Sequence, residues 1–244
     1  MPDAIFSHPR LAAIYDAFDG DRGDLDFYAE IADELGARSV IDVGCGTGNL
    51  ALLLAATGRR VLAADPAAAS LAVATSKPGA ADVDWILGDA SSLPSLGADL
   101  AVMTGNVAQV FLTDDDWSRT LDAIGAALRP GGYLVFETRR PERRAWEEWS
   151  AQSEPEPELL ALPEIGVVQR RLELTAVDLP LVSFRYTYRF ASDGTVLTSD
   201  STLRFRSREE VESSLVTSGY RVKDVRDAPD RAGREFMFVA ERAG

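Results

Sequence analysis

Short apolar runs alternate with helical stretches between residues 40 and 137, and this alternation is the strongest pattern in the chain. The runs that we interpret as strands lie near residues 39–44, 59–66, 83–89, 98–105 and 132–138. Residues 49–58 and 117–132 have helical periodicity and end in glycine or proline. Strands that alternate with helices are typical of βαβ units, so the pattern predicts an α/β fold with a mostly parallel, doubly wound sheet.

Helix signals occur on both sides of this region. Two helices are expected before the first strand, near residues 11–18 and 25–35, and they carry the aromatic residues Tyr15, Phe18, Phe27 and Tyr28. These aromatics either belong to the core or cover a ligand cleft. Thr113, followed by three aspartates, predicts the start of a helix. Acidic side chains in the first turn interact favourably with the helix dipole, and we prefer this interpretation of the aspartates to a metal site. Ser207 and Glu210 predict a capping box for a helix that ends near residue 218.

The period changes to two after the fifth strand. One face of residues 182–190 is aromatic or aliphatic and the other is polar, with Val182, Phe184, Tyr186, Tyr188 and Phe190 on the first face. With residues 167–177 and 196–206, this predicts a small antiparallel sheet with a turn at Asp193-Gly194. Its aromatic face must be buried against the main domain or a partner subunit. Residues 147–164, rich in proline and glutamate, are expected to form a loop, and two last strands are expected near 220–228 and 234–242.

Composition narrows the class of protein. A chain of 244 residues with 46% hydrophobic content can bury one sizeable core. No apolar run reaches the roughly 18 residues that span a bilayer and no signal peptide is visible, so we expect a cytoplasmic protein without a membrane role. The formal charge of −14 disfavours nucleic acid as a partner, because only residues 138–146 are locally basic. The single Cys45 and the single His8 leave no disulfide and no Cys/His metal cluster, and we expect no metal.

The sequence VIDVGCGTGNLALLLA, residues 40–55, joins the first strand to a helix through three glycines. Such a turn at the carboxyl end of a strand is typical of nucleotide binding in open α/β sheets, because glycine permits positive φ and close approach of a ligand. A dinucleotide fingerprint would place a glycine at position 49, where this chain has Asn49. The spacing Asp42-x-Gly44-x-Gly46-x-Gly48 therefore disfavours a nicotinamide-dependent oxidoreductase.

The same spacing resembles motif I of the class I S-adenosylmethionine (SAM) dependent methyltransferases. The segments VLAADP, ILGDASSLP and LRPGGYLVFET are similar to that family's second strand, third strand end and turn into the fifth strand. Residues 220–242 are similar to its last crossover and reversed seventh strand. The resemblance implies a seven-stranded sheet with a reversed last strand and SAM as cofactor.

The resemblance also assigns residues to the cofactor site. Asp65 would hold the ribose hydroxyls, and a carboxylate is suited to accept hydrogen bonds from a diol. Asp89 and the backbone of Ala90 would recognise adenine, while Thr104 and Gly105 would contact the methionine end. The full set of cofactor positions is Asp42, Gly44, Gly46, Gly48, Asn49, Asp65, Pro66, Asp89, Ala90, Thr104 and Gly105.

Methyl transfer requires mainly that a nucleophile be held about 3 Å from the methyl group and in line with the leaving sulfur. The end of the fourth strand, MTGNVAQVF, lacks the Asn/Asp-Pro-Pro-aromatic motif of family members that methylate nucleic-acid bases or protein amides. Asn106 is the candidate for orienting the substrate, with Gln109 behind it; alternatively, both satisfy loop backbone. His8 is a weak candidate base, so an amine acceptor, or a hydroxyl activated by a carboxylate, is favoured.

The predicted organisation is a helical cover at 1–38, a SAM-binding core at 39–138 and 207–244, and an inserted antiparallel subdomain at 139–206. An insert and helical cover resemble the small-molecule methyltransferases of the family, including N,N-dimethyltransferases of amino sugars. The insert then forms a lid, a pocket or a dimer contact, so the protein is a monomer or homodimer. The candidate pocket residues are Tyr15, Tyr28, Gln109, Arg139, Arg140, Trp146 and Trp149, for some of which packing or surface ion pairs are the alternative.

The favoured function is methyl transfer from SAM to a small molecule, with nitrogen slightly ahead of oxygen as the acceptor. The alternative is a SAM-binding protein without catalysis that acts in regulation or assembly. The two differ in whether cofactor binding is accompanied by turnover.

Overall fold

The central feature of the computed structural model, which describes residues 1–20, 22–152, 157–228 and 231–244, is a seven-stranded sheet. Its strand order is β10-β11-β5-β4-β1-β2-β3. The strands β1 to β5 pair in parallel, whereas β11 runs antiparallel to β5 and β10 antiparallel to β11. The bounds are β1 Ser39–Val43, β2 Arg60–Asp65, β3 Val83–Leu87, β4 Ala98–Met103, β5 Leu128–Arg139, β10 Tyr220–Asp227 and β11 Glu235–Arg242. This confirms the predicted α/β fold, a seven-stranded and mostly parallel sheet with a reversed last strand.

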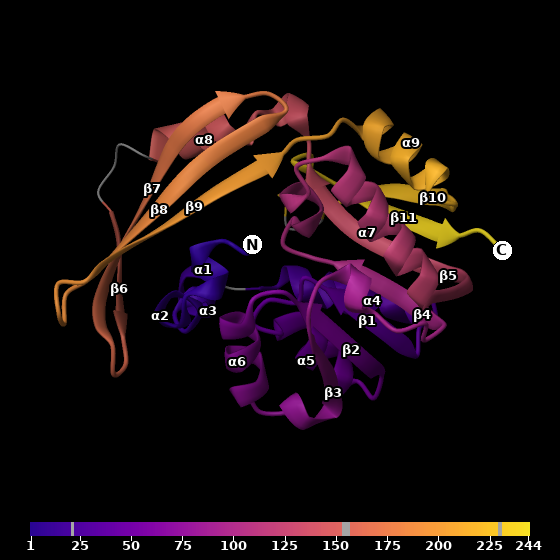
Figure 1. Cartoon of the computed structure of the whole chain (residues 1–244), viewed down its shortest axis with the longest axis horizontal. Helices are drawn as coiled ribbons and strands as arrows, with labels where there is room; N and C mark the ends of the chain where they lie inside the picture. Colours follow the sequence, from indigo (N-terminus) through magenta and orange to yellow (C-terminus); the bar gives the residue numbers. More distant parts are fainter. Residues whose placement is uncertain (21, 153–156, 229–230) are drawn as a thin grey trace.

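Helices cover both faces of the sheet (Figure 1). They are α4 Asp24–Glu34, α5 Asn49–Ala56, α6 Ala68–Ser76, α7 Asp114–Ala127 and α9 Arg208–Thr217, with short 3-10 helices η1 Ala80–Asp82, η2 Ala90–Ser92, η3 Val107–Val110 and η4 Pro141–Arg143. Both predicted helix starts are confirmed. The Thr113 hydroxyl accepts a hydrogen bond from the backbone N–H of Asp116 (3.1 Å), and Ser207 and Glu210 form the reciprocal capping box.

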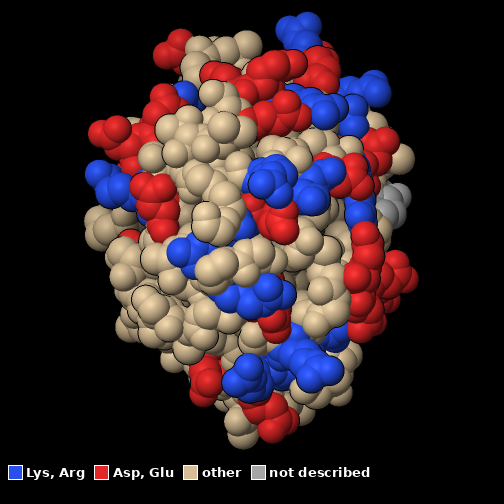
Figure 2. Space-filling model, turned by 90° about the vertical axis from the view of Figure 1, so that its right-hand side faces the viewer, with Lys and Arg blue, Asp and Glu red and all other residues tan. Residues whose placement is uncertain are grey.

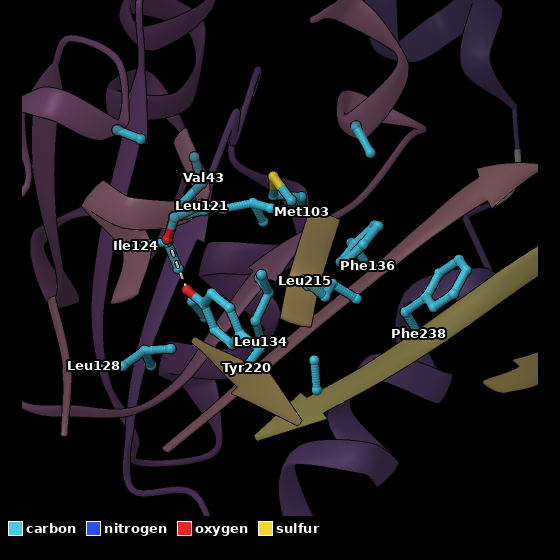
Figure 3. Close-up of a cluster of buried hydrophobic side chains, with 14 of the residues drawn as sticks. Val43, Met103, Leu121, Ile124, Leu128, Leu134, Phe136, Leu215, Tyr220 and Phe238 are labelled. Atoms are coloured by element: carbon cyan, nitrogen blue, oxygen red, sulfur yellow. Dashed lines mark hydrogen bonds between the residues drawn. The ribbon is translucent and has the colours of Figure 1, made fainter. Parts of the chain in front are cut away.

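Alternate residues of the central strands enter two separate cores, one on each face. Phe136 and Phe238 stack at 5.3 Å in the core beneath α7 and α9, while Val135 and Val239 point into the core beneath α4 and α5. The Tyr220 hydroxyl, at the edge of the first core, donates to the carbonyl of Leu121 at 2.8 Å (Figure 3). The period of two along buried strands therefore determines which helix layer each side chain contacts.

The helices before the first strand differ from the prediction. One helix was predicted near residues 11–18, but the structure has three short ones, α1 Ala4–Ser7, α2 Pro9–Ala12 and α3 Tyr15–Asp19. His8 causes the first break, because its ring nitrogen accepts the N–H of Arg10 and Pro9 occupies the first position of α2. The second predicted helix is present as α4.

The inserted sheet has four strands where the sequence predicted three. They are β6 Glu158–Leu162, β7 Gly166–Asp178, β8 Leu181–Phe190 and β9 Val196–Arg204, in the order β6-β7-β8-β9. The predicted loop at 147–164 was wrong at both ends, since α8 Ala145–Gln152 precedes β6; residues 153–156 lie outside the described part. The Pro and Glu content of this segment favoured a loop in the prediction. The strand β6 nevertheless forms because it can pair with the long strand β7.

The aromatic face of the insert lies against parts of the same chain. Tyr188 and Phe190 pack against Leu11, Ile14 and Phe18 of the N-terminal segment. At the other end of the sheet, Trp146 of α8 packs over Val182. The arched sheet and the helices α1 to α3 therefore form a separate layer beside the main core, with a hydrophobic cluster between them (Figure 1).

The surface beside α9 and β10 carries charges of both signs in close alternation (Figure 2). Arg208 pairs with Glu212 on α9, and Arg221 pairs with Glu241 across β10 and β11. No helix in the described residues is long and apolar enough to cross a membrane.

Candidate cofactor and acceptor site

The three motif glycines form a loop at the carboxyl end of β1, and all three have positive φ. A Cβ at Gly44 would lie 2.7 Å from Val107, and a Cβ at Gly48 would lie 2.6 Å from the ring of Trp85. Gly46, with φ of 54°, has nothing within 4 Å of the same position. The outer glycines therefore allow the loop to pack closely, while the middle one leaves open space beside the backbone.

Gly105 provides a second open position on the neighbouring strand. It follows β4, has φ of 71° and also has nothing within 4 Å of a Cβ. Because β4 pairs with β1, the loops after these strands meet at one edge of the sheet. The strand order reverses between β1 and β4, which is where open α/β sheets bind nucleotides.

Two buried aspartates lie beneath the glycine loop. Asp65 ends β2, where its carboxylate accepts the backbone N–H of Gly46 at 2.8 Å and of Ala67 at 2.7 Å. Burial raises the pKa of Asp65, and these two bonds partly oppose the shift. Asp42 is 1% exposed and has no hydrogen-bond partner for either oxygen in the described part of the chain. Burial, together with the charge of Asp65, raises the pKa of Asp42 to about 7.

The remaining predicted cofactor residues line the same edge. Asp89 is exposed after β3 and caps η2 by accepting the N–H of Ser91 at 2.9 Å. Ala90 is buried beside it, Pro66 is exposed after β2, and Thr104 is half-buried after β4. The side chain of Asn49 instead takes part in a polar cluster with Asp16, Thr47 and Lys77.

Asn106 lies over a buried carboxyl pair. Asn106 is 3% exposed. Its backbone N–H donates a hydrogen bond to Glu137 (2.6 Å), and its side-chain amide nitrogen donates one to Glu235 (3.0 Å). Oδ1 of Asn106 and Oε2 of Glu137 are buried and have no partner among the described residues. Burial, and secondarily the charge of Glu235, raise the pKa of Glu137 to about 8 against the bond from Asn106.

Arg139 connects this polar cluster to the aromatic sheet. Its guanidinium donates to Gln109 at 3.0 Å, lies 3.9 Å from Glu235 and sits over the ring of Trp149 at 5.4 Å. The aromatic contacts continue along the insert, from Trp149 to Phe184 (5.3 Å) and on to Tyr186 (5.7 Å). Of the predicted pocket residues, the structure thus brings Gln109, Arg139 and Trp149 together.

Comparison with known proteins shows which families this chain resembles. Residues 40–132 match the family described as "Methyltransferase domain". The ubiquinone/menaquinone biosynthesis C-methyltransferase UbiE of Rubrivivax gelatinosus is 34% identical over 120 residues, 49% of this chain and 45% of that protein. The chain thus matches about half the length of this curated relative.

Solved structures extend the similarity to nearly the whole chain. A methyltransferase structure from Clostridium acetobutylicum has a TM-score of 0.74 at 20% identity and covers 96% of this chain and 98% of its own. SAM-bound CalS10, an amino pentose methyltransferase from Micromonospora echinaspora, has a TM-score of 0.72 at 26% identity, covering 94% and 97%. Residues 40–132 thus resemble a methyltransferase domain, and the chain as a whole has the fold of class I SAM-dependent methyltransferases.

The strand edge has features that fit SAM, the cofactor of the methyltransferases that the chain resembles. The open positions at Gly46 and Gly105 give a ligand access to backbone from two adjacent strand ends. The unpartnered carboxylate of Asp42 lies at the same strand end, and the cofactor carries an ammonium group that such a carboxylate can attract. Among the described residues, no group of three or more His, Cys, Asp or Glu side chains could hold a metal ion.

The sequence alone did not identify the carboxyl pair of Glu137 and Glu235. Glu137 appeared only as the end of a strand, and Glu235 only as the start of another, 98 residues away by numbering. The pairing of β5 with β11 places Met237 opposite Glu137 and Glu235 opposite Arg139, so the two carboxyls share one edge. A charged residue at the end of an otherwise apolar strand is the signal that could have identified them.

Several other predicted residues lie apart from this group. Tyr28 packs in the core beneath α4, and Arg140 turns to Asp227 and to the ring of Phe236. Trp146 packs edge-on against Phe205 at 4.9 Å. Tyr15 belongs to the N-terminal cluster, near Tyr186, and burial raises the pKa of its hydroxyl.

Proposed function

We propose that this protein is a methyltransferase that transfers the methyl group of SAM to a small-molecule acceptor, with an amine favoured over a hydroxyl. The observation that carries the proposal is the combination of the glycine loop with an enclosed aromatic sheet above the same strand edge. Phe184 and Tyr186 are half-buried near the centre of that sheet, where Phe184 contacts Trp149 of α8 and Tyr186 packs against the N-terminal cluster. Together with Arg139, these rings would offer aromatic and charged contacts to a small polar acceptor.

The cofactor supplies an activated methyl carbon when it is bound. In the proposal, Asp65 and Asp89 hold the ribose and the adenine, and Thr104 and Gly105 contact the methionine end. The chain then contributes mainly positioning, because an in-line displacement at an activated carbon needs correct alignment of the nucleophile.

An amine acceptor is consistent with the state of the candidate bases near the strand edge. The raised pKa of Glu137 keeps its carboxyl protonated at neutral pH, Glu235 pairs with Arg231 at 3.0 Å, and His8 is occupied in capping α2. A neutral amine attacks without a base and releases its proton afterwards, whereas a hydroxyl needs earlier activation. CalS10, which covers nearly the whole chain, is described as an amino pentose methyltransferase, and this supports the amine class for the acceptor.

Two measurements test the proposal. Calorimetry with S-adenosylhomocysteine (SAH) should show binding with a Kd below roughly 100 μM, a free energy beyond about −5.5 kcal/mol. Incubation with methyl-labelled SAM and matched amino and hydroxy sugars should label the amines. Binding without labelling of any acceptor would favour the noncatalytic alternative, and absence of SAH binding would refute the proposed function.

The Asp65→Ala variant checks the assignment of the ribose. SAH affinity should fall by about 1 to 3 kcal/mol, the scale of charge-assisted hydrogen bonds. Asp84, an exposed aspartate on β3, provides a matched Asp84→Ala control. Equal affinities in the two variants would contradict the assignment of Asp65.

A further inference from the structure

A polar clamp joins the N-terminal cover to the glycine loop. Asp16 of α3 accepts hydrogen bonds from the Thr47 hydroxyl at 2.5 Å and from the Asn49 amide at 3.2 Å. Lys77 donates to the Asn49 side chain (2.6 Å) and to the carbonyl of Thr47 (2.8 Å), and pairs with Asp16 at 2.6 Å. We call these four residues the Asp16 clamp.

The Asp16 clamp holds the glycine loop through the residues that alternate with the glycines. Gly46 and Gly48 flank Thr47, so Thr47 and Asn49 are the polar side chains through which this turn can be held. Thr47 is 4% exposed, and the Lys77 side chain is 20% exposed. Partly buried, charge-assisted bonds hold a backbone more strongly than a solvated surface pair.

The other side of α3 faces the inserted sheet. Phe18 packs edge-on against Tyr188 at 5.7 Å, and the guanidinium of Arg170 lies over the Phe18 ring at 4.7 Å. Tyr15 precedes Asp16 directly and packs with Phe6 at 5.3 Å in the same cluster. One short helix therefore contacts the glycine loop on one side and the sheet of the proposed acceptor pocket on the other.

We propose that Asp16 and Lys77 are positioning residues for the cofactor, which hold the Thr47 turn in its binding conformation and thereby slow cofactor release. The inference rests on the proposed function, because it assumes that the glycine loop binds SAM. Neither residue is required to touch the cofactor, since both act through Thr47 and Asn49. The clamp also makes docking of the cover a condition for retaining the cofactor.

The dissociation rate of SAH from the immobilised full-length chain tests the clamp. We expect Asp16→Ala and Lys77→Met each to raise the rate about tenfold, as loss of roughly 1.4 kcal/mol of charge-assisted bonding would do. The double variant should be within about twofold of the single variants, because both changes disrupt the same network. Lys77→Arg, which keeps the charge, should restore most of the slow release.

The control is Asp193→Ala, which removes another ion pair of the cover. Arg10 joins α2 to Asp193 in the β8–β9 turn at 2.7 Å, with side chains 31% and 49% exposed. This variant should leave SAH release within about twofold of wild type, because an exposed ion pair contributes little to docking of the cover and this one does not contact the loop. Equal acceleration by Asp193→Ala and Asp16→Ala would refute the specific clamp.

The outcomes separate the two proposals. Wild-type binding of SAH with unchanged release in Asp16→Ala and Lys77→Met would overturn the clamp and leave the proposed function standing. Absence of SAH binding to the wild type would overturn both. A melting curve for each variant identifies loss of folding, and Lys77→Met keeps the test valid if Asp16→Ala does not fold.

Discussion

The three glycines of the motif have two different structural roles, close packing at Gly44 and Gly48 and open space at Gly46. Gly44 lies against Val107, Gly48 lies against Trp85 and Ala74, and Gly46 faces open space. The sequence shows three equivalent glycines in alternation, but the neighbours that distinguish them come from strands and helices elsewhere in the chain. Of these three glycines, Gly46 is the one that combines positive φ with room for a ligand.

Alanine substitutions at these positions should separate packing from binding. Gly48→Ala should lower the free energy of unfolding by roughly 2 to 4 kcal/mol, because the new Cβ adds a clash with the Trp85 ring to backbone strain. Gly46→Ala should lower it by only about 1 kcal/mol, from the strain alone, yet weaken SAH binding. Urea denaturation and calorimetry measure the two effects, and equal stability losses would contradict the distinction.

At the scale of elements, the loop after β4 is held by the segment that joins β9 to α9. Arg206 is 4% exposed, and its guanidinium donates to the carbonyls of Ala108 (3.3 Å), Phe111 (2.7 Å) and Thr113 (3.3 Å). Burial lowers the pKa of Arg206 to about 10. The segment that carries Asn106 is thus fixed by a residue 100 positions later.

Removing this guanidinium should destabilise the loop after β4. In Arg206→Met, three backbone carbonyls lose a donor and the buried cavity of the guanidinium is left without its polar partners, so the free energy of unfolding should fall by roughly 2 to 4 kcal/mol. Hydrogen exchange should increase in residues 104–113 more than in the central strands. Arg208→Met is the control, because Arg208 pairs with Glu212 on the exposed face of α9. Similar exchange in the two variants would contradict the role of Arg206.

At the scale of the whole molecule, buried carboxyls make stability depend on pH. Asp42 and Glu137 have pKa values raised to about 7 and about 8, whereas the unfolded chain releases these protons near pH 4. Between these values the folded state binds more protons, so the free energy of unfolding decreases as pH rises. Both groups lie at the strand edge of the proposed site. Ionised carboxylates buried there lower the stability of the folded state.

We therefore expect the free energy of unfolding to decrease between about pH 4 and pH 8 by an amount on the order of several kcal/mol. The double variant Asp42→Asn/Glu137→Gln should flatten this part of the profile and be more stable than wild type at pH 8. Urea denaturation at a series of pH values measures the slope, with Asp84→Asn, an exposed substitution on β3, as the control. An unchanged slope in the double variant would show that these carboxyls do not cause the dependence.

The sequence by itself determined the features that are local in the chain. The strand periodicity, the caps at Thr113 and Ser207, the glycine turn and the aromatic alternation of residues 182–190 each depend on near neighbours, and each was confirmed. Tertiary structure decided what depends on distant neighbours: the extra strand β6, which exists through its pairing with β7, and the Asn106 cluster, which β11 completes. It also decided what covers the aromatic face, because burial of that face was required by the pattern but its partner, the N-terminal helices, was set by packing.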